Sequence, residues 1–261
     1  MHAEVITSRS NPLITRIRKL ASDKALRRAE GVFLGEGPKL LEEALRWNAA
    51  LETVVRAEGV ELPALPSPVR VVEVPEDLLR SAAPTQSPQG VLFLCRGEAL
   101  ALPERLEGVR YLVLDGVQDP GNVGTIWRTA DAFGADGLIL TGPCADPWNP
   151  KTVRATMGAC FRLPVWEAGL EALNARLLEA GLPLYATALR NDTVDLRQAD
   201  LSRCAVVIGS EGRGVSQRTL ELCTQTLRIP MTEARLPGVE LFAFDPDELD
   251  RIVRDRVGRS V

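Results

Sequence analysis

Short apolar runs alternate with helical patterns along the second half of the chain, and this alternation constrains the fold most strongly. The run at 111–114 is continuous and apolar, and a helical pattern at 123–133 follows it after a glycine-rich turn. Continuous apolar runs are typical of strands that are buried on both faces by flanking helices. The sequence therefore predicts an α/β fold with a mainly parallel sheet. Further strands are expected at 137–140, 164–166, 184–188, 205–208 and 227–229, and further helices at 150–157, 170–180 and 220–223.

The first part of the chain has the pattern of a separate, smaller α/β unit. Apolar residues recur at three- and four-residue spacing after Asn11-Pro12, which predicts a helix, and a second helix is expected after Gly37-Pro38. Residues 96–108 carry Gly, Pro and charge without a period, which is typical of a linker. We expect a unit at 1–97, a linker at 98–108 and a second unit at 109–261. Within the first unit, strands are expected at 53–56, 69–74 and 91–94, with a helix at 75–79.

The composition excludes several kinds of site. The chain of 261 residues contains one histidine, His2, so a Ser-His-Asp triad, a Cys-His pair and a histidine-rich metal site are not expected. The five cysteines are scattered and never spaced as Cys-x-x-Cys, which argues against a disulfide framework and against bound zinc. No apolar run approaches the ~20 residues that span a bilayer, and residues 1–18 lack the apolar core of a signal peptide. We predict a cytoplasmic protein without metal or membrane contact.

Basic residues are concentrated at the N-terminus although the net charge is −4. Residues 1–28 hold seven basic side chains against two acidic ones, and a local excess of this kind can face nucleic-acid phosphates. A solvated amphipathic helix explains the same charges equally well. The candidate RNA-binding residues here are Arg9, Arg16, Arg18, Lys19 and Arg27, with Lys24 and Arg28 beside them.

The first candidate site follows the strand expected at 111–114 and reads DGVQDPGNVGTIWRTADAFG. Ligands of open α/β sheets bind at the carboxyl ends of strands. Pro120-Gly121 and Gly124 allow a tight turn and a close backbone approach, and Asn122 lies before the expected helix as a possible cap. Arg128 follows six residues later and can hold a phosphate. The competing interpretation is a capped helix whose arginine pairs with a surface carboxylate.

Two further segments have the pattern of ligand-binding loops. The segment VVIGSEGRGVS ends a strand with three glycines, and the amides of Gly209, Gly212 and Gly214 could cradle a polar ligand while Glu211 positions a hydroxyl or amine. An ordinary strand-to-helix turn is an equally good interpretation. In LRIPM, the proline forces extended backbone and leaves polar groups free for an adenine edge.

In their order and spacing, the three segments together resemble the SpoU/TrmH family of RNA 2′-O-ribose methyltransferases, within the SPOUT superfamily. The first family motif is matched by Asn122, Arg128 and Ala132-Phe133-Gly134. The second, Gly-x-Glu-x-x-Gly, is matched at 209–214, and the third begins with Ile229-Pro230-Met231. FLGEGPKLLEEAL and SPQGV in the first unit resemble the family's L30e-like RNA-binding domain.

The resemblance implies a trefoil-knotted methyltransferase domain, a homodimer, and methyl transfer from S-adenosylmethionine (SAM) to a ribose 2′-hydroxyl of rRNA or tRNA. It also implies that Asn122, Arg128 and Glu211 form the catalytic site, with Arg128 on the RNA phosphate. Because an arginine has a pKa above ~12, we interpret Arg128 as an electrostatic activator and leave the base unassigned. The cofactor-binding residues implied are Thr187, Gly209, Glu211, Gly214, Ile229, Met231 and Leu241.

The sequence departs from the family after Met231. Ser-Leu-Asn does not follow, and the chain continues as TEARLPGVELFAF. Asp245-Pro246-Asp247-Glu248 then predicts the start of a short charged helix. This departure is the basis of an alternative interpretation, a catalytically impaired RNA-binding relative.

Overall fold

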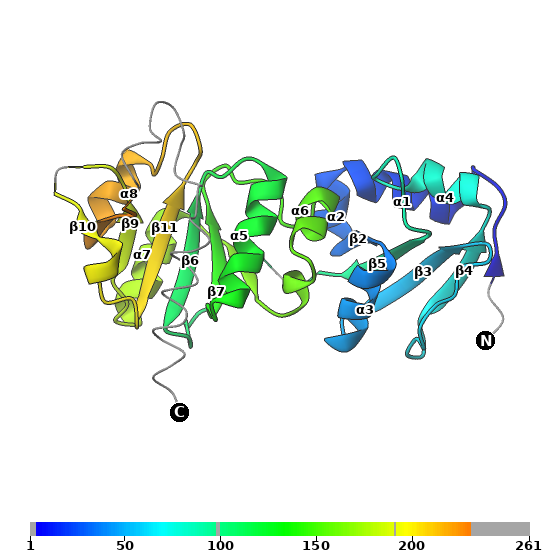
Figure 1. The fold of residues 1–261 in the computed structure, drawn as a ribbon, viewed down its shortest axis with the longest axis horizontal. Coiled ribbons are helices and arrows are strands. Elements are labelled where there is room, and N and C mark those ends of the chain that lie inside the picture. The colour runs from blue at the N-terminus through cyan, green and yellow to red at the C-terminus, as the bar shows by residue number, and fades with distance from the viewer. Residues whose placement is uncertain (1–3, 98–99, 191, 231–261) are drawn as a thin grey trace.

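The computed structural model describes residues 4–97, 100–190 and 192–230. Two sheets lie one after the other along the long axis of the molecule, the first formed by the N-terminal residues (Figure 1). Within the described residues no helix is long and apolar enough to cross a membrane. The helix predicted from Asp245, and the part of the chain that would complete a knot, lie outside the described residues.

The first sheet has five strands in the order β1-β4-β3-β5-β2. Strand β4 pairs in parallel with β1 and β3, whereas β5 is antiparallel to β2 and β3. Helices α1, α2 and α4 lie on one side of this sheet and α3 on the other (Figure 1). The strands are β1 Glu4–Val5, β2 Val32–Glu36, β3 Leu51–Ala57, β4 Arg70–Val74 and β5 Val91–Arg96, and the helices are α1 Pro12–Ser22, α2 Lys24–Glu30, α3 Pro38–Arg46 and α4 Glu76–Ala82.

Local sequence explains the first helix. The side chain of Asn11 accepts a hydrogen bond from the amide of Leu13, and Pro12 occupies the first turn, where its missing N–H costs nothing. The predicted apolar face is buried against β2 and α4. This helix is confirmed, as are the helices after Pro38 and Pro75 and the three predicted strands. Strands β1 and β2 and helix α2 were not predicted.

The second sheet has seven strands in the order β10-β12-β9-β11-β6-β7-β8, and every pair is parallel. The predicted mainly parallel α/β fold is therefore confirmed. Strand β6 lies between β7 and β11, so the chain changes direction across the sheet at this strand, where ligands of such sheets bind. The strands are β6 Arg110–Asp115, β7 Gly137–Thr141, β8 Val165–Glu167, β9 Leu184–Thr187, β10 Val194–Asp195, β11 Cys204–Gly209 and β12 Gln225–Arg228.

The four predicted helices of the second unit are present, and the first and the last of them begin three residues earlier than expected. Helix α5 begins at Pro120, earlier than expected, because the carboxylate of Asp119 accepts a hydrogen bond from the amide of Asn122 at 2.9 Å. The prediction that Asn122 precedes the helix and caps it is wrong, since it lies in the first turn. The helices are α5 Pro120–Ala132, α6 Pro150–Ala155, α7 Leu170–Glu179 and α8 Gln217–Leu222, with short 3-10 turns at Ala159–Phe161 and Leu196–Gln198.

The two units share one apolar core at their junction. Residues of β2, α3 and β5 belong to the same buried cluster as residues of α5, β7 and β8. Phe33 stacks on Trp148 with ring centroids 4.6 Å apart, and Trp148 lies 5.8 Å from Trp127 of α5. The described part of the linker also packs, because the carbonyl of Leu100 accepts a hydrogen bond from the amide of Glu167. The two units are therefore in close contact, and the domain boundaries remain our prediction.

Candidate active site

The loops that carry the first two motifs follow two neighbouring strands of the second sheet, β6 and β11. Strands β6 and β11 are paired in register, with Leu114 opposite Ile208 and Asp115 opposite Gly209. The loops that follow therefore begin at the same level, at the carboxyl edge of the sheet. Across them, the amide nitrogen Nδ2 of Asn122 donates a hydrogen bond of 2.5 Å to Oε1 of Glu211, 89 residues away. Two of the three predicted catalytic residues are thus in direct contact.

Asp115, which we did not predict as a site residue, fixes the far end of the second loop. Its side chain is buried, with 9% of the residue exposed, at the end of β6. Oxygen Oδ2 accepts hydrogen bonds of 2.7 Å from the amide of Ser216 and from the hydroxyl of Thr219. The signal in the sequence was an acidic residue that directly ends an apolar strand.

The glycines of the second loop serve to close it. A Cβ on Gly209 would lie 2.0 Å from the carbonyl carbon of Gly214, so a side chain does not fit there. Ser210 and Gly214 exchange two backbone hydrogen bonds of 3.0 and 2.8 Å, and Gly214 has a φ of +66°. The predicted cradle of free amides is therefore wrong for Gly214, whose N–H is bonded within the loop. This closed turn holds Glu211 half-buried beside α5.

The start of α5 is supported from α6. Lys151 Nζ lies 2.6 Å from Oδ2 of Asp119, the residue that caps α5 and bonds Asn122. The hydrogen bond from Lys151 is the main reason why the pKa of Asp119 lies below its usual value. A Cβ on Gly124 would lie 2.4 Å from the carbonyl oxygen of Thr152, so Gly124 permits close packing of α5 on α6. The close backbone approach predicted at Gly124 is therefore an approach of α5 to α6.

Arg128, the third predicted catalytic residue, lies two turns into α5 and is exposed. Within the described parts of the chain no carboxylate pairs with it, so the ion-pair interpretation has no support there. Its guanidinium is available to an external anion.

The predicted cofactor residues that the structure describes follow neighbouring strands. Thr187 ends β9 and pairs in register with Leu227 of β12; its hydroxyl donates a hydrogen bond of 2.9 Å to the carbonyl of Val207 in β11. Ile229, half-buried, directly follows β12. The carboxyl ends of β9, β11 and β12 thus bring Thr187, Gly209 and Ile229 to one edge of the sheet. Met231 and Leu241 lie outside the described residues.

The N-terminal basic patch is largely neutralised by ion pairs, and one of its members is misassigned. Arg27 is 2% exposed, and its guanidinium bonds Oδ2 of Asp146 at 2.7 and 2.9 Å. The prediction that Arg27 binds RNA is wrong, because its guanidinium is buried and each of its three nitrogens donates a hydrogen bond within the protein, so it cannot reach a phosphate.

The other predicted RNA-binding residues remain accessible to different degrees. Arg9 pairs with Asp77, Arg16 pairs with two glutamates, and Arg18 bonds Ser81, whereas Lys19 is exposed and pairs with no described residue. Their binding to RNA stays a prediction. As for metals, the described chain holds no group of three His, Cys, Asp or Glu side chains that could bind an ion.

A parallel sheet with glycine-closed loops at its switch point is the architecture of α/β proteins that bind nucleotide-like ligands. Residues 110–235 match the SpoU rRNA Methylase family, and residues 11–92 match the MRM3-like substrate binding domain. The chain is 32% identical to the 23S rRNA (guanosine(2553)-2′-O)-methyltransferase RlmP of Bacillus subtilis, over 87% of this chain and 90% of that protein. The chain therefore belongs to the SpoU rRNA methylase family.

Solved structures agree with this assignment. An AdoMet-bound rRNA methyltransferase from Sinorhizobium meliloti is 32% identical, with a TM-score of 0.77 over 91% of this chain and 93% of that chain. The SpoU methyltransferase AviRb from Streptomyces viridochromogenes, in complex with the cofactor AdoMet, is 26% identical, with a TM-score of 0.77 over 95% of this chain and 98% of that chain. The predicted SPOUT-type α/β architecture, with an N-terminal sheet unit, is confirmed.

Proposed function

We propose that the chain transfers a methyl group from SAM to a ribose 2′-hydroxyl of ribosomal RNA. The single observation that carries this proposal is the hydrogen bond between Asn122 and Glu211, which unites the first and second motifs at the carboxyl edge of the sheet. The names of the relatives support the chemistry, since RlmP is named as a 2′-O-methyltransferase of 23S rRNA. These names give no support to the alternative of a catalytically impaired relative.

The residues at this edge suit a cofactor of mixed polarity. SAM, when bound, would supply a methyl group on a positively charged sulfur. An oxygen nucleophile could take this methyl group while the sulfur leaves as a neutral thioether. We assign its binding to the backbone and side chains around Thr187, Gly209, Gly214 and Ile229, where strand ends and a closed turn present polar groups beside apolar surface. The AdoMet-bound relatives support this assignment.

The side chains of this chain would act on the RNA. We assign to Arg128 the phosphate next to the reacting ribose, where its charge stabilises the oxygen as it loses its proton. We assign to Glu211 the orientation of the hydroxyl, and to Asn122 the orientation of Glu211 through their hydrogen bond. The only histidine, His2, is far in sequence from these motifs. We therefore leave the base unassigned.

We favour ribosomal over transfer RNA because two relatives whose names print the methylated nucleotide, RlmP and the enzyme of Streptomyces viridochromogenes, are named as 23S rRNA 2′-O-methyltransferases. We also propose a cytoplasmic location, which the similarity to the bacterial enzyme RlmP supports. We also propose a homodimer, as the family resemblance implies.

The proposal is tested by mapping 2′-O-methyl groups in total RNA from a strain with and without the gene. We expect one ribosomal position to lose its methyl group without the gene and to regain it with wild type, but not with Arg128→Ala. Arg203→Ala is the matched control, because Arg203 is an exposed arginine at the amino edge of the sheet, before β11. An unchanged methylation map in the deletion strain, together with no SAM binding by calorimetry, contradicts the proposal.

A further inference from the structure

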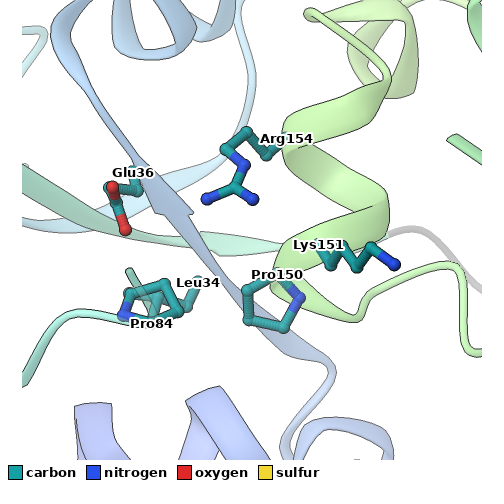
Figure 2. Close-up of a pocket in the computed structure, with 6 residues that line it drawn as sticks. All are labelled: Leu34, Glu36, Pro84, Pro150, Lys151 and Arg154. Atoms are coloured by element: carbon teal, nitrogen blue, oxygen red, sulfur yellow. The ribbon is translucent and has the colours of Figure 1, made fainter. Parts of the chain in front are cut away.

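A small cavity lies at the junction of the two units, outside the motif loops. It has a volume of about 50 Å³ and lies between β2, the segment after α4, and α6 (Figure 2). A space of this size admits a few water-sized polar groups and no nucleobase. Its lining residues are Leu34, Glu36, Pro84, Pro150, Lys151 and Arg154.

Two cations of α6 border this cavity. Lys151 and Arg154 are three residues apart, so they project from neighbouring positions of the helix. Arg154 is exposed, and no hydrogen bond or ion pair joins its guanidinium to any described residue. Lys151 donates to Asp119, which leaves two of its three N–H donors for another partner. Each side chain can therefore bind a phosphate, Arg154 on the cavity side of α6 and Lys151 on the side that faces away from the cavity (Figure 2).

One carboxylate oxygen inside the cavity lacks a donor. Oε1 of Glu36 accepts a hydrogen bond of 2.5 Å from the hydroxyl of Thr85, whereas Oε2 is buried and has no partner. A buried acceptor without a donor is unfavourable, so this oxygen is poised to accept a hydrogen bond from a ligand. In Figure 2 the side chain of Arg154 extends from α6 toward Glu36 across the cavity. The cavity thus offers one donor to a phosphate at its mouth and one hydroxyl acceptor within it.

We propose that this cavity is a second RNA backbone subsite, in which Arg154 binds one phosphate, Lys151 binds a neighbouring phosphate outside the cavity, and Oε2 of Glu36 accepts a hydrogen bond from a ribose 2′-hydroxyl. The inference rests on the proposed function, because it takes RNA as the substrate. Lys151 joins the two places, since it also bonds the residue that caps α5 before Asn122. Contact with a 2′-hydroxyl distinguishes RNA from DNA, which a phosphate contact alone does not.

The phosphate part is tested with Arg154→Ala by fluorescence anisotropy, using a labelled oligouridylate as the probe. We expect about a tenfold loss of affinity and a log–log salt slope smaller by ~0.7, the value for one single-strand phosphate contact. Arg203→Ala removes the same charge at the opposite edge of the sheet and should leave both quantities near wild type. Equal affinities and slopes for the two variants overturn the proposal.

The hydroxyl part is tested with Glu36→Ala and Glu36→Gln, comparing the oligouridylate with the matching oligodeoxyuridylate. We expect Glu36→Ala to reduce the preference for the ribose form several-fold, because the acceptor is gone. Glu36→Gln should retain most of it, because its side-chain carbonyl still accepts a hydrogen bond. Melting curves establish that both variants are folded. An unchanged ratio in Glu36→Ala overturns the hydroxyl contact.

Methyl transfer separates failure of the subsite from failure of the proposed function. If wild type methylates ribosomal RNA, Arg154→Ala should raise the KM for RNA more than it lowers kcat. Active wild type with Arg154→Ala indistinguishable from Arg203→Ala overturns the subsite alone. Inactive wild type with a clear affinity loss in Arg154→Ala overturns the proposed function and supports the subsite.

Discussion

The junction between the two units and the candidate active site are held together by different forces. At the junction, Arg27 and Asp146 form a buried ion pair beside the stacked rings of Phe33 and Trp148. At the active site, Asn122 and Glu211 are half-buried and are joined by one side-chain hydrogen bond between two loops. The apolar area buried at the junction contributes strongly to the free energy of folding. The half-exposed hydrogen bond at the active site contributes little to it.

From this difference we infer that one region of the chain mainly determines its stability and the other mainly determines its catalysis. The junction contains closely packed aromatic rings and paired charges that join the two units. A substitution there should therefore destabilise both units. The active-site loops depend on local devices, namely a closed glycine turn and the buried carboxylate of Asp115. Changes at the junction should therefore alter unfolding before catalysis, and changes in the loops should do the reverse.

The largest effect is expected for Asp146→Ala, which would leave the guanidinium of Arg27 buried without its counter-charge. We expect the free energy of unfolding to fall by about 3–5 kcal/mol, measured by urea denaturation. The double change Arg27→Met with Asp146→Leu should recover most of it, because apolar residues of similar volume replace a buried pair well.

Asp77→Ala is the matched control for that prediction. It removes the partner of Arg9 in an ion pair that is exposed on both sides, so no measurable change in unfolding is expected. If Asp146→Ala behaved like Asp77→Ala, the buried ion pair at the junction would stabilise the fold no more than an exposed ion pair does.

The second prediction concerns chemistry. Asn122→Asp would set a second carboxylate against that of Glu211, and repulsion should separate the two loops. Because such misplacement can cost about a hundredfold in rate, we expect a loss of that order in single-turnover methyl transfer at neutral pH. Repulsion also raises the pKa of one carboxyl, so the loss should become smaller as the pH falls and that group takes a proton.

Exchanging the two side chains sharpens this test. In the double variant Asn122→Asp with Glu211→Gln, an amide and a carboxylate again face each other, and part of the activity should return. The free energy of unfolding should stay close to wild type in both variants. A large loss of stability in Asn122→Asp would show that the loops and the junction are not separable.

The fold and the first two motifs were predictable because they depend on patterns of residues that are close in sequence. Strands such as β6 and β11 are continuous apolar runs, and glycines mark the second loop wherever the chain turns sharply. The start of α5 was missed although its signal is local. An acidic residue followed by a proline, as at Asp119-Pro120, marks a cap and a first turn, and this sign is stronger than that of Asn122.

Contacts between distant residues could not be predicted in the same way. The charge pattern of 1–28 did not reveal that Arg27 is buried, because its partner Asp146 lies 119 residues further on. Strand β2 is only five residues long and is stabilised by its pairing with β5. The local pattern of residues does not encode this pairing. Similarly, the role of Asp115 depends on the register of β6 and β11, which places the amide of Ser216 beside its carboxylate.

Lys151 belongs to both regions, and it gives the smallest predicted effect. It lines the junction cavity and lowers the pKa of Asp119 by its hydrogen bond. A lowered carboxyl pKa contributes stability that is present above the unfolded value of 3.8 and is lost as the pH falls through the folded value. Lys151→Met should remove this contribution, which we expect to be below about 1 kcal/mol because the side chains of Lys151 and Asp119 are 53% and 43% exposed.

The pH dependence is what identifies the source of that small effect. Urea denaturation should show the deficit of Lys151→Met at pH 7. The deficit should shrink as the pH falls below the usual aspartate pKa of 3.8 and through the lowered pKa of Asp119 in the folded wild type. Lys39→Met, an exposed lysine on α3 without an ion pair in the described chain, should show no such dependence. A deficit of constant size from pH 7 to pH 3 would mean that Lys151 acts through packing at the junction, and not through Asp119 at the active site.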